Sequence, residues 1–354
     1  MSTEATTTAP GPAAASAVAL EVTGLTVRID TARGPVVAVD DVGFRAHSGE
    51  TLALLGESGC GKSITAQAIA GLLDPVAEVS GGEARLGDVD LLGLDPAARR
   101  ATAGPELAIV FQDALTALNP VYTVGTQLAE PFRIHQGLSA AKAHERAVEL
   151  MRRVGIPEPE NRAGDHPHQF SGGMRQRLLI AMAVALGPRV LLADEPTTAL
   201  DVTVQAQIME LLRDLRTEHR MAVVLITHDL ALVSEQADRV AVMYAGAVVE
   251  TGPVHEVFGR PLHPYTRGLL DSVPSAGPRP GGDGSAEGAG TGRRRELASI
   301  PGAPPDLHSI PSGCVYQDRC PLVRDVCRTR RPALEATGED RTSACHFWKE
   351  LEHG

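Results

Sequence analysis

The sequence is poor in aromatic residues and contains no long apolar run. Only 3% of its 354 residues are aromatic, and there is a single tryptophan. A membrane-spanning helix needs about 20 consecutive apolar residues, whereas the longest candidates here are interrupted by charged residues such as Arg189 or Asp194. We therefore expect no membrane span, so any role at a membrane requires a partner.

An excess of positive charge and a secretion signal are also absent. The formal net charge is −11 and no basic stripe is visible, which argues against nucleic acid as the main ligand. Residues 1–17 are rich in Ala, Thr and Pro and lack the basic start and apolar centre of a signal peptide. They are predicted to form a disordered tail. A hydrophobic content of 43% supports a sizeable core, and the length suggests two or three structural units.

The most informative motif is a complete G-x-x-x-x-G-K-S loop. The apolar run at 51–55 before it is typical of a buried strand, and residues 63–73 favour a helix, which is the context that the motif requires. Backbone N–H groups and the helix N-terminus would surround phosphates, the lysine would reach the β- and γ-phosphates, and the serine would hold Mg²⁺. The predicted nucleoside triphosphate site comprises Gly56, Glu57, Ser58, Gly59, Cys60, Gly61, Lys62, Ser63 and Ile64.

Two further apolar strands are predicted to deliver polar residues to the same site. The run at 190–193 ends in Asp194 and Glu195, and the run at 222–227 ends at His228. Asp194 would support the Mg²⁺ shell, and Glu195 could act as general base on the attacking water. Between them, a Ser-Gly-Gly sequence at 171–173 precedes an apolar helical pattern at 178–186. By itself that tripeptide most often marks a turn.

In this order, the motifs resemble the nucleotide-binding domain of ABC transporters over residues 18–272. The resemblance implies an α/β fold: a RecA-like core, an antiparallel β subdomain and a helical signature subdomain at about 113–188. It also implies a dimer in which the signature of one subunit closes on ATP held by the other. The implied roles are Gln112 as Q-loop glutamine and Mg²⁺ contact, Ser171, Gly172 and Gly173 as signature, Asp201 as D-loop aspartate, and His228 as switch histidine.

One position departs from the family pattern, and one other class of ABC ATPase remains as an alternative. Ile29 falls where the family has an aromatic residue that stacks on adenine, which predicts looser base selectivity. Soluble chromosome-organising and repair ATPases share these motifs but insert long coiled coils before the signature. Here only 107 residues separate Ser63 from Ser171, without sustained heptads. Transport is therefore favoured over the soluble alternative.

The C-terminal part narrows the family. Its motifs are LHPYTRGLL at 262–270, IPGAPP at 300–305, GC at 313–314 and RCP at 319–321. They resemble the tail of oligopeptide and dipeptide importer ATPases, with a nickel importer as the alternative within that family. The resemblance implies an ATPase at the cytoplasmic face of the membrane that works with two permease subunits, a second ATP-binding subunit and a solute-binding protein. Residues 273–296 are Gly-, Pro- and Ser-rich and are predicted to be a flexible linker to a Cys-rich region at 297–354.

Four cysteines in that region have the spacing C-x5-C-x6-C-x17-C: Cys314, Cys320, Cys327 and Cys345. Disulfides are disfavoured in a reducing cytosol. Four thiolates suit a [4Fe–4S] cluster, which family members carry at matching cysteines, or a Zn²⁺ ion, although the close pairs typical of zinc are missing. Arg319, Arg324 and Arg328 are expected to offset the cluster's negative charge. Because the nucleotide motifs lie far earlier in the sequence, we expect ATP binding to be independent of this region.

Overall fold

The computed structural model describes residues 17–112, 117–198, 200–273 and 299–352. The predicted N-terminal tail lies outside the described residues except for Ala17. The predicted linker lies outside them except for Val273. Of the helices in the described ranges, none is long and apolar enough to cross a membrane.

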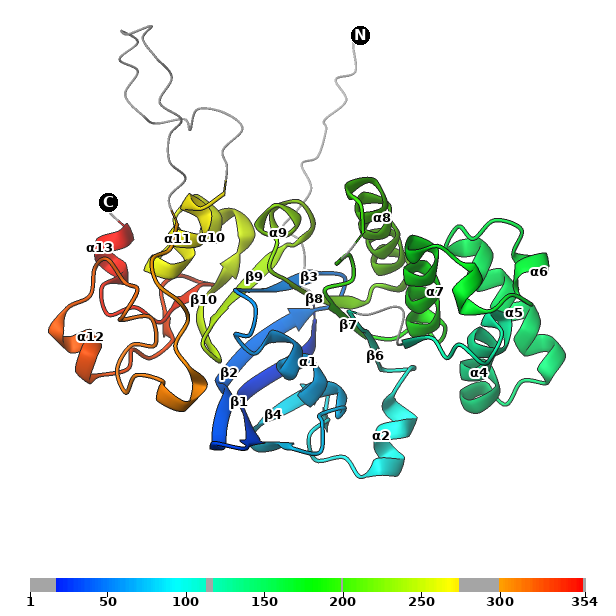
Figure 1. The fold of residues 1–354 in the computed structure, drawn as a ribbon, viewed down its shortest axis with the longest axis horizontal. Coiled ribbons are helices and arrows are strands. Elements are labelled where there is room, and N and C mark those ends of the chain that lie inside the picture. The colour runs from blue at the N-terminus through cyan, green and yellow to red at the C-terminus, as the bar shows by residue number, and fades with distance from the viewer. Residues whose placement is uncertain (1–16, 113–116, 199, 274–298, 353–354) are drawn as a thin grey trace, which may run out of the picture.

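The core is an eight-stranded sheet of order β11-β12-β10-β9-β3-β8-β7-β6 (Figure 1). Neighbouring strands from β9 to β6 are parallel, and their residues are almost all buried, as expected for strands covered on both faces. A tight turn at Ala245-Gly246 joins β9 to the antiparallel β10. The strand bounds are β3 (Thr51–Leu55), β6 (Leu107–Val110), β7 (Val190–Asp194), β8 (Ala222–Thr227), β9 (Arg239–Tyr244), β10 (Ala247–Pro253), β11 (Glu335–Ala336) and β12 (Thr342–Ser343).

A second, antiparallel sheet has the order β2-β1-β4-β5. It consists of β1 (Val18–Thr31), β2 (Gly34–His47), β4 (Ala77–Leu86) and β5 (Val89–Asp90). Helix α1 (Lys62–Ala70) packs with both sheets in one apolar core through Ala66 and Ile69. Ile29 lies within β1, where it pairs with Val36 and Ala77. Its effect on base selectivity stays a prediction.

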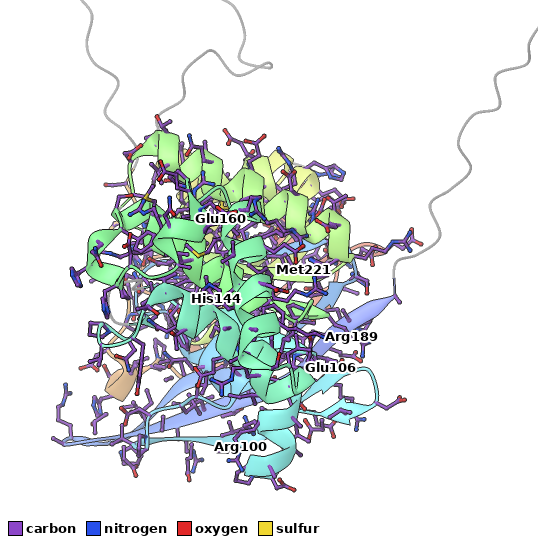
Figure 2. All side chains as sticks on the ribbon, turned by 90° about the vertical axis from the view of Figure 1, so that its right-hand side faces the viewer. Arg100, Glu106, His144, Glu160, Arg189 and Met221 are labelled. Atoms are coloured by element: carbon purple, nitrogen blue, oxygen red, sulfur yellow. The ribbon has the colours of Figure 1, made fainter. Side chains whose placement is uncertain are left out.

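Helices between β6 and β7 form the part of the molecule that lies opposite the C-terminal region (Figure 1). They are α4 (Val124–Gln136), α5 (Ala140–Arg153), α6 (Pro159–Arg162) and α7 (Gly172–Val184), and they share a separate apolar core that includes Leu128, Phe132, Met151 and Leu178. Ser139 caps α5, accepting a hydrogen bond from the Lys142 N–H. Figure 2 looks onto this side, where Glu106 and Arg189 pair at 3.3 Å beside β6 and β7.

The remaining helices complete the ATPase part and begin the C-terminal part. Helix α2 (Pro96–Thr102) follows the second sheet. Helix α8 (Val202–His219) packs on β6, β7 and β8 through Ile208 and Leu212. Helices α9 (Leu230–Gln236), α10 (Val254–Gly259) and α11 (Pro264–Asp271) lie next to β9 and β10 (Figure 1).

The C-terminal region, which comprises residues 299–352 in the structure, is built directly onto the ATPase sheet. Strand β12 pairs with β10, so this region supplies the last two strands of the sheet. Arg341 bonds to the fully buried Glu250 of β10 at 2.8 Å. Its apolar residues, among them Tyr316, join a core with Tyr244 and Tyr265. A segment with few large apolar residues is therefore held by the core of the neighbouring domain. Its helices are η2 (Leu307–Ser309), α12 (Asp325–Thr329) and α13 (Trp348–Glu352).

Candidate active site

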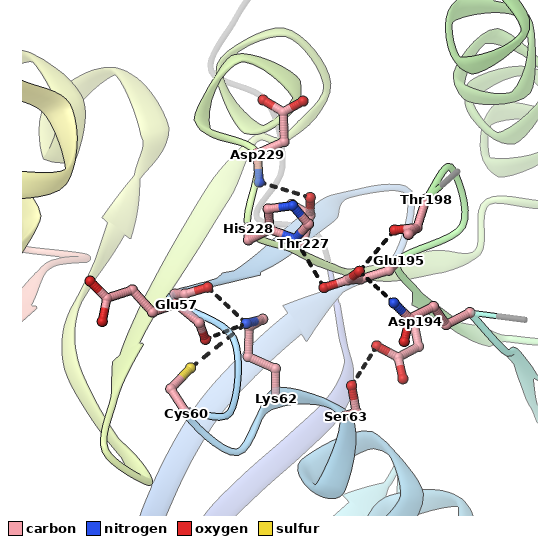
Figure 3. Close-up of polar contacts among 12 residues, drawn as sticks. Glu57, Cys60, Lys62, Ser63, Asp194, Glu195, Thr198, Thr227, His228 and Asp229 are labelled. Carbon is pink, nitrogen blue, oxygen red and sulfur yellow. Dashed lines mark hydrogen bonds and ion pairs between the residues drawn. The ribbon is translucent and has the colours of Figure 1, made fainter. Parts of the chain in front are cut away.

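The G-x-x-x-x-G-K-S loop follows β3 and borders an open pocket of about 640 Å³. Lys62 Nζ donates to the carbonyl oxygens of Gly56 at 2.7 Å and Glu57 at 2.9 Å (Figure 3). The close packing of the loop requires glycine at its start, because a Cβ at Gly56 would lie 2.3 Å from the Met243 carbonyl oxygen. Lys62 is thus held within the loop, where phosphate oxygens could replace these two acceptors.

Ser63 and Asp194 lie side by side next to the loop. Ser63 Oγ donates to Asp194 Oδ1 at 2.9 Å (Figure 3). Burial raises the pKa of Asp194, and the hydrogen bond from Ser63 partly offsets that effect. Both groups are hard oxygen donors, and Mg²⁺ in nucleotide sites takes one or two such protein ligands together with waters and phosphate oxygens. Among the described residues, no three His, Cys, Asp or Glu side chains form a ready-made metal site, and a Mg²⁺ ion brought by a nucleotide does not need one.

Glu195 is the centre of a polar cluster at the ends of three parallel strands. Its carboxylate accepts hydrogen bonds from Gln112 Nε2 at 2.8 Å and Thr198 Oγ1 at 2.8 Å, and it lies 3.0 Å from His228 Nδ1 (Figure 3). The backbone at Glu195 is left-handed, with φ of 44°. Such strain concentrates at functional sites, because the surrounding structure must enforce it. The bond from Gln112 shows that this amide faces Glu195; its contact with Mg²⁺ stays a prediction.

The protonation of Glu195 follows from these contacts. Burial raises the pKa of the carboxyl, but hydrogen bonds from Thr198 and His228 outweigh burial and lower the pKa below its ordinary value. The group is therefore ionised at neutral pH. Because the folded pKa is depressed, its contribution to stability is present above the ordinary carboxyl pKa and is lost as the pH falls through the folded pKa. An ionised carboxylate can orient a water molecule and accept its proton.

Several predicted residues lie outside this pocket. Ser171 caps α7, its Oγ accepting from the Met174 N–H at 3.3 Å, and Asp201 caps α8, accepting from the Val204 N–H at 3.0 Å. Neither residue lines the pocket that holds Lys62 and Glu195. Cys60 is buried, with its Sγ 3.8 Å from Lys62 Nζ.

Thr198 and Leu269 line the pocket although no sequence motif indicated them. Thr198 could have been suggested by its position three residues after Glu195. Leu269 belongs to α11 and carries no polar signal.

A side chain of the C-terminal region contacts the phosphate loop, although the two lie far apart in the sequence. Arg319 forks onto the Glu57 carboxylate, with Nη1–Oε2 at 2.7 Å and Nη2–Oε1 at 3.1 Å. The Glu57 N–H donates to the Tyr265 hydroxyl at 3.0 Å. The two ends of the Arg319–Glu57 pair are 262 positions apart, so sequence distance was a poor guide to contact.

The four C-terminal cysteines line one small cavity together with Tyr316 and Phe347. All five cysteines of the chain are free thiols. The Cys314 N–H donates to the Cys327 carbonyl oxygen at 2.7 Å, and a Cβ at Gly313 would lie 2.2 Å from that oxygen. Burial raises the pKa of Cys314 to about 11 and that of Cys345 to about 12. The four thiols therefore share one cavity, but among the described residues no three of them form a group that could hold a metal ion.

Two of the three arginines that were expected to offset cluster charge form ion pairs with carboxylates, and their role at the cluster stays a prediction. Arg319 pairs with Glu57, and Arg324 pairs with Glu350 while its guanidinium lies over the Phe347 ring. These two arginines are thus already neutralised by carboxylates. Thiolates in this cavity would therefore meet less positive charge than the sequence predicts.

Comparisons with known proteins agree with this geometry. The ABC transporter family model matches residues 39–198, and that of the oligopeptide/dipeptide transporter C-terminal region matches residues 249–327. The chain is 44% identical to the dipeptide transport ATP-binding protein DppD of Escherichia coli strain K12, over 93% of this chain and 96% of that protein. It is 46% identical to a putative peptide import ATP-binding protein of Brucella abortus strain 2308, over 94% of this chain and 98% of that protein.

A solved structure of an ATP-binding cassette has a similar fold. The dimeric post-hydrolysis state of the ATP-binding cassette MJ0796, bound to ADP and Pi, is 27% identical, with a TM-score of 0.60 over 66% of this chain and 98% of that one. The expected ABC ATPase fold is confirmed. The chain belongs to the ABC transporter ATPases, in the family of dipeptide and oligopeptide transport ATP-binding proteins.

Proposed function

We propose that this chain hydrolyses ATP to power the import of dipeptides or oligopeptides through an ABC transporter. The proposal rests on one observation: the ATP site and the C-terminal region of a peptide transporter are parts of the same fold. An ionised Glu195 faces the phosphate loop, and a C-terminal region matching that of oligopeptide/dipeptide transporters is built onto the same sheet. The relatives named for dipeptide transport and peptide import support the choice of solute.

In the proposed reaction, Lys62 would exchange its carbonyl acceptors for β- and γ-phosphate oxygens. Ser63 and Asp194 would hold Mg²⁺, which neutralises phosphate charge when bound. Glu195 would orient the attacking water and accept its proton, while Gln112, Thr198 and His228 fix the carboxylate. Each role rests on a contact already present in the structure.

A second ATP-binding subunit would complete the site. Ser171, Gly172 and Gly173 form the exposed N-terminus of α7, and Asp201 forms that of α8. None of these four residues lines the pocket at the chain's own phosphate loop. We infer that the N-terminus of α7 would instead close on the ATP held by a partner subunit.

Two permease subunits would provide the path across the membrane, with this chain docked at their cytoplasmic side. A largely apolar cleft of about 680 Å³ lies between α2, β6, α4 and α7. Three of its large apolar residues are exposed to solvent: Leu72 at 50%, Phe111 at 37% and Ile134 at 67%. Figure 2 looks onto this side, with Arg100 of α2 at the lower end of the view. Since Phe111 adjoins Gln112, a permease helix seated here would be coupled to the Glu195 cluster.

Replacing Ile134 with aspartate is expected to reduce co-purification of the chain with its permeases at least about fivefold, because burying a carboxylate in an apolar contact is costly. ATP binding by the isolated chain should be unchanged. A matched control is Leu334→Asp, which alters an apolar residue of similar size, 39% exposed, in the C-terminal region. Equal co-purification of both variants with the permeases would contradict docking at this cleft.

For the four cysteines we propose a [4Fe–4S] cluster, with Zn²⁺ as the alternative. Four thiols lining one cavity support this donor set. A tetrahedral zinc site would need its sulfurs within about 2.3 Å of a single point, and the described residues contain no group of three or more metal-binding side chains arranged for one ion. A cluster accepts more widely spaced thiolates.

Peptide uptake into proteoliposomes tests the proposed function. The chain, its permeases, the second ATPase and the solute-binding protein are expected to import peptide only with ATP, and Lys62→Ala should abolish uptake by weakening nucleotide binding. Nickel uptake without peptide uptake would favour the nickel alternative. If the chain hydrolysed ATP but associated with no permease, the soluble ATPase alternative would replace the proposal.

A further inference from the structure

The phosphate loop is held from outside the ATPase domain by one arginine. Arg319 is almost fully buried, with 6% of its side chain exposed. Its Nε donates to the Pro301 carbonyl oxygen at 2.9 Å, and its two terminal nitrogens fork onto Glu57 at 2.7 and 3.1 Å. Bidentate contacts of this kind fix both distance and orientation. Arg319 therefore joins two stretches of the C-terminal region to the second residue of the loop.

Glu57 is held at all three of its polar groups. Tyr265 accepts from its N–H, Lys62 donates to its carbonyl oxygen, and Arg319 pairs with its carboxylate. Glu57 also lines the pocket that is to receive a triphosphate. A carboxylate in that place would repel the phosphates unless it is neutralised and turned aside, and Arg319 meets both needs. Arg319 Nη1 also donates to the hydroxyl of Tyr244 in β9 at 3.5 Å.

We propose that Arg319 is a positioning residue for ATP binding, which acts through Glu57 and makes nucleotide affinity depend on the folded state of the C-terminal region. Arg319 does not contact Glu195, so its replacement is expected to change ATP binding rather than ATP hydrolysis. Cys320 follows Arg319 directly, and the Cys314 N–H bonds to the Cys327 carbonyl oxygen. Loss of order among the cysteines would therefore release Arg319 from the loop.

Nucleotide affinity of the full-length chain tests the proposal, measured with a fluorescent ATP analogue and by the KM for ATP in the assembled transporter. Arg319→Gln is expected to weaken binding and raise KM about tenfold, the equivalent of roughly 1.4 kcal/mol, while kcat stays within about twofold. Arg319→Lys keeps the positive charge but cannot make the bidentate contact. Its affinity for ATP should therefore lie between that of Arg319→Gln and that of the unchanged protein. Combining Arg319→Gln with Glu57→Gln should restore part of the lost affinity, because no unpaired carboxylate then faces the phosphates.

Arg331→Gln is the matched control. Arg331 also pairs across the two regions, with Asp40 of β2, but it is 40% exposed and does not touch the loop; its replacement should leave ATP affinity unchanged. Metal content and the thermal midpoint of each variant report whether the C-terminal region is still folded. Two results would overturn the proposal: affinity of Arg319→Gln within twofold of the unchanged protein, or a double variant that binds ATP no better than Arg319→Gln alone. The second result would mean that Arg319 acts through folding of its own region and not through Glu57.

Discussion

Glu195→Gln is expected to lower steady-state ATP hydrolysis by the assembled transporter at least about 100-fold, the loss typical for removal of a general base. Glutamine keeps the size of the side chain and can still bond to Thr198, but it cannot accept a proton from water. ATP should still bind, because Lys62, Ser63 and the loop backbone are unchanged. The variant should therefore hold ATP and keep the two ATP-binding subunits closed.

Three measurements check this result: phosphate release, ATP retained after gel filtration, and the association state of the ATPase subunits with ATP. Glu106→Gln is a suitable control, because Glu106 is a half-exposed carboxylate that pairs with Arg189 outside the pocket (Figure 2). Its activity should equal that of the unchanged protein. Hydrolysis by Glu195→Gln near the unchanged rate would remove Glu195 from the base role.

The parts of the site that could be predicted from the sequence are those carried by local patterns. The apolar runs before Gly56, Asp194 and His228 became β3, β7 and β8, because buried parallel strands are recognisable as short continuous apolar segments. Since these strands are parallel neighbours, the residues that follow them meet at one edge of the sheet. Helix α1 ends at Ala70, earlier than the predicted residue 73, because Gly71 adopts the left-handed conformation that ends a helix.

The contacts that could not be predicted are long-range and leave little local trace. Strands β11 and β12 have two residues each, too short for an alternating pattern, and they form because β10 offers an open edge. The Arg319–Glu57 pair depends on how the C-terminal region folds against β9 and α11, which no motif records. The four cysteines led to the prediction of a metal group in this region, but they did not indicate that the region lies against the phosphate loop.

The Cys320→Ser variant should lose the metal group and with it the order of residues 299–352. Protein purified without oxygen is expected to be brown and to contain about four irons per chain, and the variant should be colourless. The region has few large apolar residues of its own, so ligation of the proposed metal group by the four cysteines would supply much of its folding free energy. Limited proteolysis should then cleave the C-terminal region while the ATPase core persists, since the apolar cores around Leu54, Leu178 and Ile208 do not include it.

Cys60→Ser provides the matched control for iron content, because Cys60 lies in the phosphate loop away from the cavity shared by the other four cysteines. It should retain the full complement of iron. Stoichiometric zinc without iron, in protein made and kept without oxygen, would replace the cluster with a zinc tetrathiolate. From sequence distance alone, Cys320→Ser should leave ATP binding intact. The proposed role of Arg319 leads to the opposite expectation: disorder at Cys320 would free the neighbouring Arg319, leave the Glu57 carboxylate unpaired beside the triphosphate, and weaken ATP binding about as much as Arg319→Gln does.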